Sequence, residues 1–117
     1  MTVRVAGPAA LLVSKLHKIA DREERPDRLG DKDALDVLRL LQGTEAGELA
    51  GSLQRLLASE ISGDVTRQAL GFLQRLFGVE DAPGVAMAVR ATEGLEEAAT
   101  IRLACTMLAS ELLEAML

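Results

Sequence analysis

The chain has 117 residues, of which 49% are hydrophobic and 26% are charged, and it carries a formal net charge of −5. This length suits a single domain that buries roughly two thirds of its unfolded surface, and the composition excludes an intrinsically disordered chain. The excess of acidic residues, with no basic cluster, excludes a general phosphate-binding surface, so we expect no direct binding of nucleic acid by this chain alone.

Aromatic side chains are nearly absent, which limits how a core can be built. Phe72 and Phe77 are the only Phe, Tyr or Trp residues, so the core has to consist of Leu, Ala, Val, Ile and Met. This composition suits helices better than sheets. We therefore expect an all-α fold, a compact bundle of about five to six helices with a short N-terminal extended arm.

Cysteine use and hydropathy bear on the compartment. Cys105 is the only cysteine, so no intramolecular disulfide can form, and no leader-like segment precedes the first amphipathic stretch. The apolar runs are shorter than the roughly 20 residues that cross a bilayer. We expect a cytoplasmic protein with no membrane span.

The organisation predicted for residues 1–117 is one helical domain, with an arm or strand remnant at 1–7, a helical hairpin at 8–42 and a helical bundle at 44–117. The alternation in Thr2–Ala6 suits a short strand, which Gly7 and Pro8 end. A lone strand lies as an arm, pairs with a second copy, or belonged to a sheet that this chain lacks. We favour the third interpretation.

The hairpin follows from helical spacing and from turn residues. A first helix is predicted over Pro8–Arg22, and the Pro and mixed charges of residues 23–30 predict a solvated loop. Asp31 is then the expected N-cap of a second helix that ends near Gly43. The expected inward residues are Leu12, Leu16 and Ile19 in the first helix and Leu35, Leu38 and Leu41 in the second.

Two more helices and a short third one are predicted next. Thr44 is the expected cap of one helix, and Ser62 or Gly63 precedes another that Gly78 ends. Residues 81–84 predict a turn, and a short Ala-rich helix follows to about residue 93. The expected inward residues are Leu49, Leu53, Leu56 and Leu57, then Val65, Ala69, Phe72, Leu73 and Leu76.

A long terminal helix is predicted from near Glu96. Its main apolar stripe consists of Ile101, Cys105, Leu108 and Leu112. Leu103 and Met107 lie off that stripe and widen the apolar surface. We therefore expect this helix to be either deeply buried or covered by another subunit.

The hairpin brings opposite charges together if its helices are antiparallel. Lys15 and Lys18 share one face of the first helix, and Asp33 and Asp36 share one face of the second, because positions i and i+3 are neighbours. The structural interpretation is that cross-helix ion pairs fix the hairpin, each contributing about 0.2–1 kcal/mol. The chemical interpretation is a polar site.

The order of these residues resembles a known family. The segment KLHKI, a short charged loop and then KDALDVLRLL resemble the helices that follow the catalytic sheet in the AbiEii-type nucleotidyltransferases, which include toxins of type IV toxin–antitoxin systems. Residues 7–12 fit the junction into the first of these helices, and Val3–Val5 fit the end of the preceding strand. The resemblance covers roughly residues 3–42, about a third of the chain.

The resemblance implies roles for four residues. Lys15 would contact the phosphates of a nucleotide, and Asp33 would be the catalytic-site carboxylate that positions a metal-bound substrate. Lys18 and Asp36 would support the hairpin. The complete enzyme would use Mg²⁺ and a nucleoside triphosphate, since nucleotidyl transfer depends on positioning and on neutralising phosphate charge.

One departure from the family limits what this chain can do. The metal-binding signature of the family, a Gly-Ser followed by an Asp-x-Asp on the catalytic sheet, is absent from the sequence. We therefore expect no metal site and no catalysis in isolation. The expectation is a non-catalytic helical C-terminal domain that contributes to a composite site and acts as a nucleotidyltransferase only when joined to a missing or separate catalytic domain.

The alternative function is a helical protein-interaction module without nucleotide chemistry. The wide apolar face of the terminal helix would then form a homo-oligomer or bind another partner. His17 is expected to be a partly exposed helix residue, because it lacks companion metal ligands. Cys105 is expected to be a small core hydrophobe.

Overall fold

The computed structural model describes residues 7–23, 25 and 27–117, and these form six helices and no strand. The prediction of an all-α bundle is confirmed. The strand predicted over Thr2–Ala6 lies outside the described residues. None of the helices in the described part of the chain has the length and apolar character needed to cross a membrane.

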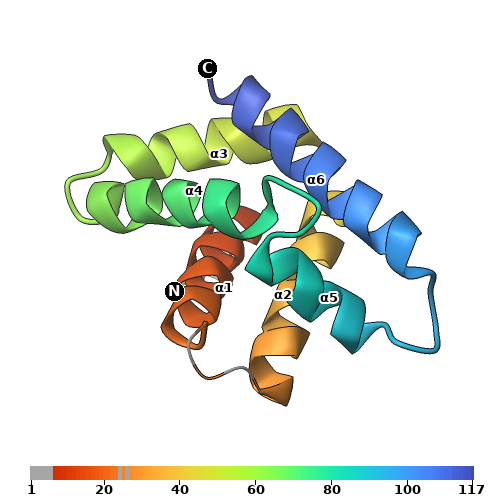
Figure 1. The fold of residues 1–117 in the computed structure, drawn as a ribbon. Coiled ribbons are helices and arrows are strands. Elements are labelled where there is room, and N and C mark those ends of the chain that lie inside the picture. The colour runs from red at the N-terminus through yellow and green to blue at the C-terminus, as the bar shows by residue number, and fades with distance from the viewer. Residues whose placement is uncertain (1–6, 24, 26) are drawn as a thin grey trace, which may run out of the picture.

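The first two helices form the antiparallel hairpin drawn in red and orange in Figure 1. Helix α1 spans Pro8–Asp21 and begins with a proline, whose missing N–H would have no helical partner at that position. Helix α2 spans Arg28–Gly43. The predicted inward residues Leu12, Leu16, Ile19, Leu38 and Leu41 are buried, and Leu35 is partly buried.

The start of α2 differs from the prediction. Asp27, not Asp31, is the N-cap, and its carboxylate accepts a hydrogen bond from the Gly30 N–H at 2.9 Å. Residues 28–30 therefore belong to the first helical turn and not to a loop. Gly30, which suggested a turn in the sequence, is buried beside Arg22.

Helices α3 (Ala46–Ala58) and α4 (Gly63–Phe77) form a second antiparallel pair. Glu45, not Thr44, is the N-cap of α3, because its carboxylate reaches two N–H groups of the first turn. The prediction that Val65 points inward is wrong, since Val65 is 45% exposed and the neighbouring Thr66 is buried. Leu49, Leu53, Ala69, Leu73 and Leu76 are buried as predicted.

Helices α5 (Pro83–Ala91) and α6 (Ala98–Ala115) complete the fold. Between them Gly94 has a φ of 82°, in the left-handed region that glycine adopts without steric cost. Helix α5 packs on α2, and α6 crosses α3 and α5 (Figure 1). Ile101, Cys105 and Leu112 are buried, but Leu103 and Met107 are exposed. Of the two alternatives predicted for α6, deep burial is therefore excluded for this face, and cover by another subunit stays a prediction.

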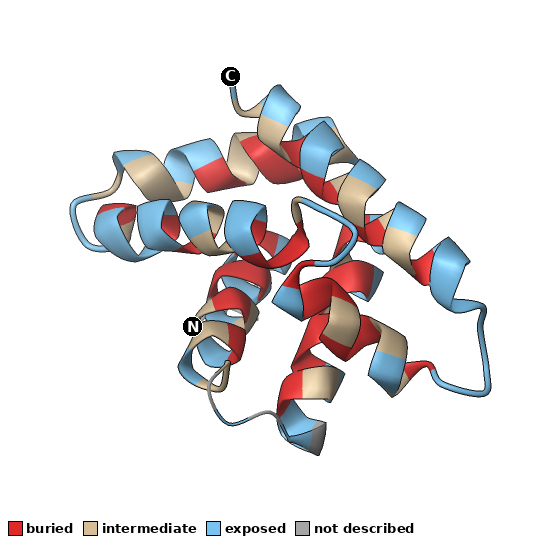
Figure 2. Ribbon diagram, viewed as in Figure 1, coloured by how far each residue is buried: buried red, intermediate tan, exposed pale blue. Residues whose placement is uncertain are grey.

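The buried residues gather where the two hairpins and α5 meet, as the red segments in Figure 2 show. Phe77 at the end of α4 is the largest fully buried side chain. Lys15 of α1 and Asp33 and Asp36 of α2 lie at the edge of this core, where the two helices face one another.

Candidate functional site

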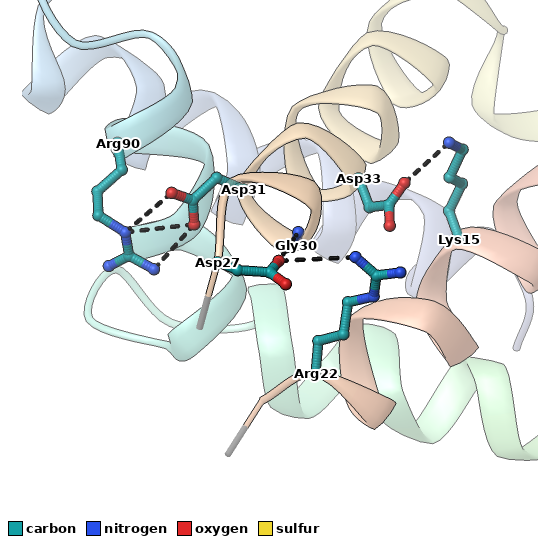
Figure 3. A network of polar contacts seen from close by, with 7 residues as sticks. All are labelled: Lys15, Arg22, Asp27, Gly30, Asp31, Asp33 and Arg90. Carbon is teal, nitrogen blue, oxygen red and sulfur yellow. Dashed lines mark hydrogen bonds and ion pairs between the residues drawn. The ribbon is translucent and has the colours of Figure 1, made fainter. Parts of the chain in front are cut away.

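The site is built around the ammonium group of Lys15, in the middle of α1. Its Nζ lies 2.9 Å from an oxygen of Asp33 and 2.9 Å from an oxygen of Asp36. Both aspartates belong to α2, and their spacing of three residues places them on one side of that helix. The hairpin thus assembles one cation and two anions, and Figure 3 shows the contact with Asp33.

The electrostatics of this triad are asymmetric. The side chain of Asp33 is 11% exposed and that of Asp36 is 36% exposed. Hydrogen bonds from Lys15 to Asp36 and to Asp33 raise the pKa of its ammonium, because both contacts favour the charged form. The ammonium is therefore firmly protonated, and the triad retains one negative charge in excess.

Because it is more buried, the carboxylate of Asp33 needs the charge of Lys15 more than the carboxylate of Asp36 does. Among the described residues, Asp33 is the only charged residue that is buried. A buried carboxylate without a partner is costly, and its neighbours Ala34, Val37 and Leu38 are apolar and fully buried. Lys15 therefore stabilises the fold by compensating the charge of Asp33.

A shallow pocket of about 370 Å³ opens beside the triad between α1 and α2. Its lining consists of Leu11, Lys15, Asp36, Arg39 and Leu40. Both cations in the lining are already paired, Lys15 with the aspartates and Arg39 with Glu96 at 2.5 Å. The pocket thus offers apolar walls, two cations and a carboxylate.

Lys18 does not join this cluster. It lies exposed in the last turn of α1, and neither carboxylate of the triad contacts it. The structure thus brings Lys15, Asp33 and Asp36 together and leaves out the fourth residue singled out in the sequence.

Two further ion pairs of α2 were not anticipated from the sequence. Arg90 of α5 holds Asp31 with contacts of 3.0 to 3.2 Å, and Arg22 lies 3.6 Å from Asp27 (Figure 3). Asp31 and Arg90 are 59 residues apart, so no local spacing could have paired them. The mixed charges of residues 23–30 suggested a solvated loop, and Asp31 was expected to cap the second helix.

The surroundings of His17 and Cys105 indicate that both side chains support the fold. The Nε2 atom of His17 lies 2.8 Å from the carbonyl oxygen of Val65, and its ring meets Phe72 edge-on at 5.1 Å. These contacts tie α1 to α4. Burial raises the pKa of the Cys105 thiol to about 11, which keeps it in the unreactive protonated form.

The carboxylates of the triad do not form a metal site by themselves. Within residues 7–23, 25 and 27–117, no group of three or more His, Cys, Asp or Glu side chains could hold a metal ion. Asp33 and Asp36 supply only two carboxylates, and both are held by Lys15.

Comparison with known proteins found no match: no family model, no curated protein and no solved structure is similar to this chain.

Proposed function

We propose that the chain is a non-catalytic helical domain of a nucleotidyltransferase-like protein that contributes Lys15 and Asp33 to a composite nucleotide site. The observation that carries the proposal is the position of the Lys15 ammonium between two carboxylates, at the edge of an open pocket. The resemblance of residues 3–42 to AbiEii-type proteins supplies the chemical class.

The charge balance of the triad defines how such a site would work. With one negative charge in excess, the triad repels a bare phosphate. Mg²⁺ bound to a nucleoside triphosphate neutralises phosphate charge and gives the carboxylates a cation to face. Lys15 can then donate to a phosphate oxygen while Asp33 and Asp36 remain charge-compensated. Lys15 is therefore expected to discriminate between a free nucleotide and its magnesium complex.

Binding to the isolated chain tests this proposal. We expect MgATP to shift the backbone amide NMR signals of α1 and α2 around residues 15 and 33–36, and ATP with EDTA to have a much smaller effect. Lys15→Gln should abolish the shifts, and the matched control Lys18→Gln should keep them, because Lys18 is exposed outside the triad. Thermal unfolding would confirm that both variants are folded.

Equal responses of the two variants, or no response of the native chain to MgATP at millimolar concentration, would contradict a phosphate contact by Lys15. An assay with an added catalytic domain would extend the same comparison to nucleotide transfer. There, unaltered transfer by the Lys15 variant would count against the proposal.

A second candidate function is self-association through α6. Leu103 is 51% exposed and Met107 is 60% exposed, and they lie one helical turn apart. An apolar ridge of this kind can pack against a second copy of the chain. Sedimentation should then show a dimer that Leu103→Ser/Met107→Ser converts to a monomer, while Leu95→Ser, in the loop before α6, does not. A native monomer at every concentration would remove this candidate.

A further inference from the structure

The guanidinium of Arg22, at the end of α1, is a weakly paired cation close to the triad. Its Nη1 atom is buried and has no hydrogen-bond partner within the described residues. This atom lies 3.6 Å from Oδ1 of Asp27, which makes an ion pair but is longer than a hydrogen bond. Because a buried N–H without an acceptor costs free energy, a better partner for this group would stabilise the protein.

The geometry of the hairpin directs Arg22 toward Asp33. Arg22 follows Lys15 by seven residues, which is about two helical turns, so both side chains leave α1 on the side that faces α2. Gly30 lets the two helices approach closely here, since a Cβ on it would lie 3.8 Å from the Cβ of Arg22. Figure 3 shows the Arg22 guanidinium pointing toward the carboxylates of Asp27 and Asp33.

Asp33 has an acceptor for this cation. Lys15 contacts its Oδ1 at 2.9 Å, and no hydrogen bond or ion pair among residues 7–23, 25 and 27–117 uses its Oδ2. The side chain is only 11% exposed, so water compensates its charge poorly. A second cation would therefore find at Asp33 both a free acceptor and a charge that needs compensation.

Asp27 can lose Arg22 with little effect on stability. Its side chain is 52% exposed, and ion pairs at such positions contribute little. Its Oδ1 also keeps the hydrogen bond from the Gly30 N–H, which caps α2. A move of Arg22 from Asp27 to Asp33 would thus replace a weak, solvated pair by a buried one.

We propose that Arg22 is a positioning residue that takes over the carboxylate of Asp33 when the ammonium of Lys15 turns to a phosphate. This exchange of partners rests on the proposed nucleotide contact of Lys15. Without a second cation, that turn would leave Asp33 buried and uncompensated, and nucleotide binding would have to offset the cost. With Arg22 on Asp33, the ammonium is released and the hairpin keeps its charge balance.

The exchange of partners is tested first without nucleotide, with Lys15→Met in place of a released lysine. In the native background, Arg22→Gln should change the unfolding equilibrium constant from urea titration by less than about fivefold, as for an exposed pair. In the Lys15→Met background the same change should raise that constant by at least about tenfold, because Asp33 then loses its last cation. Arg22→Lys keeps the charge and should avoid most of this loss.

The matched control is Arg25→Gln, which removes an exposed arginine from the same segment and should act equally in both backgrounds. A spectroscopic signal separates the proposed role from simple packing. The guanidinium NMR signals of Arg22 should move in Lys15→Met and also when MgATP is added to the native chain, while those of Arg25 stay in place. Arg22→Gln should weaken MgATP binding about tenfold, and Arg22→Lys should restore most of it.

Three outcomes would overturn the exchange of partners and leave the nucleotide contact standing: equal effects of Arg22→Gln in both backgrounds, unmoved Arg22 signals in Lys15→Met, or a Lys15→Met chain that does not fold. A native chain that shows no response to MgATP would instead overturn the nucleotide contact, and with it the role of Arg22 in the site.

Discussion

Two buried threonines differ in whether the hydroxyl has a partner. Thr92 donates to the carbonyl oxygens of Ala88 and Val89, each at 3.1 Å. The hydroxyl of Thr66 is buried and has no partner within the described residues. Since burying an unpaired hydroxyl costs free energy, Thr66→Val should raise the free energy of unfolding by about 1 kcal/mol. Urea unfolding measures this change in free energy. Thr92→Val is the control and should lower stability, because it removes a paired hydroxyl. A loss for both variants would show that the Thr66 hydroxyl is paired.

Cys105 gives a direct measure of opening of the core. It is fully buried on α6, and burial raises its pKa to about 11, so the native thiol should be almost inert at pH 8. A disulfide reagent such as DTNB should therefore react only as fast as the core opens, and rapidly in urea. Because the chain has one cysteine, the signal has one source. Complete reaction of native protein within seconds would contradict the burial.

At this scale, sequence could predict contacts that depend on one hairpin. Lys15, Asp33 and Asp36 come together because helical spacing places each on the right face and the connection between the helices is short. The Asp31–Arg90 pair depends on how α5 docks on α2, which no periodicity encodes. The prediction for Val65 is wrong because the buried face of α4 is shifted by one residue in its first turn. Thr66, and not Val65, therefore points into the core.

At the scale of elements, the contact between α4 and α5 depends on a glycine. A Cβ at Gly84 would lie 2.6 Å from the carbonyl oxygen of Leu76 and 2.8 Å from the ring of Phe77. Gly84→Ala should therefore force the helices apart and cost about 1–3 kcal/mol of stability. A Cβ at Gly71 meets nothing within 4 Å, so Gly71→Ala should stabilise α4 by about 0.5–1 kcal/mol. Thermal unfolding of the two variants should show opposite shifts, and an unchanged or raised stability of Gly84→Ala would contradict the close packing at Gly84.

Helix boundaries were predictable where a glycine or a proline marks them. Pro8 begins α1 and Gly78 follows α4, as predicted. The turn predicted over residues 81–84 is wrong in its second half, because Pro83 and Gly84 already belong to the first turn of α5. Caps were harder to predict, because Asp27 and Asp31 are both suitable residue types, and Glu45 is a less usual N-cap residue than Thr44. Only the geometry decides between them: Asp27 reaches the N–H of Gly30, and Glu45 reaches two N–H groups of α3.

At the scale of the molecule, α2 is the centre of the charge network. Its acidic residues pair with Lys15 of α1 and Arg90 of α5, and its Arg39 pairs with Glu96 before α6. The composition predicted a helical domain but not this charge network, because the network depends on how α1, α5 and the segment before α6 dock on α2.

Alkaline unfolding tests the energetic role of Lys15 in the whole molecule. Its pKa is raised in the folded state by Asp36 and Asp33, so the folded chain holds this proton more tightly than the unfolded chain does. The stabilisation is complete below the ordinary lysine pKa of about 10.4 and is lost as pH rises through the folded value. Lys15→Met should cost about 1–3 kcal/mol at pH 7, because it leaves Asp33 buried without its partner.

The difference in free energy of unfolding between the native chain and Lys15→Met should therefore be constant from pH 7 to about pH 10 and shrink above it. Cys105 also titrates in this range. Its pKa is raised in the folded state, so the free energy of unfolding falls with pH once the thiol of the unfolded chain ionises. This fall is equal in both proteins and cancels in the difference. Lys18→Met, the control, should follow the native curve. Parallel curves for the native chain and Lys15→Met up to the alkaline limit would mean that the triad contributes no proton-linked stability.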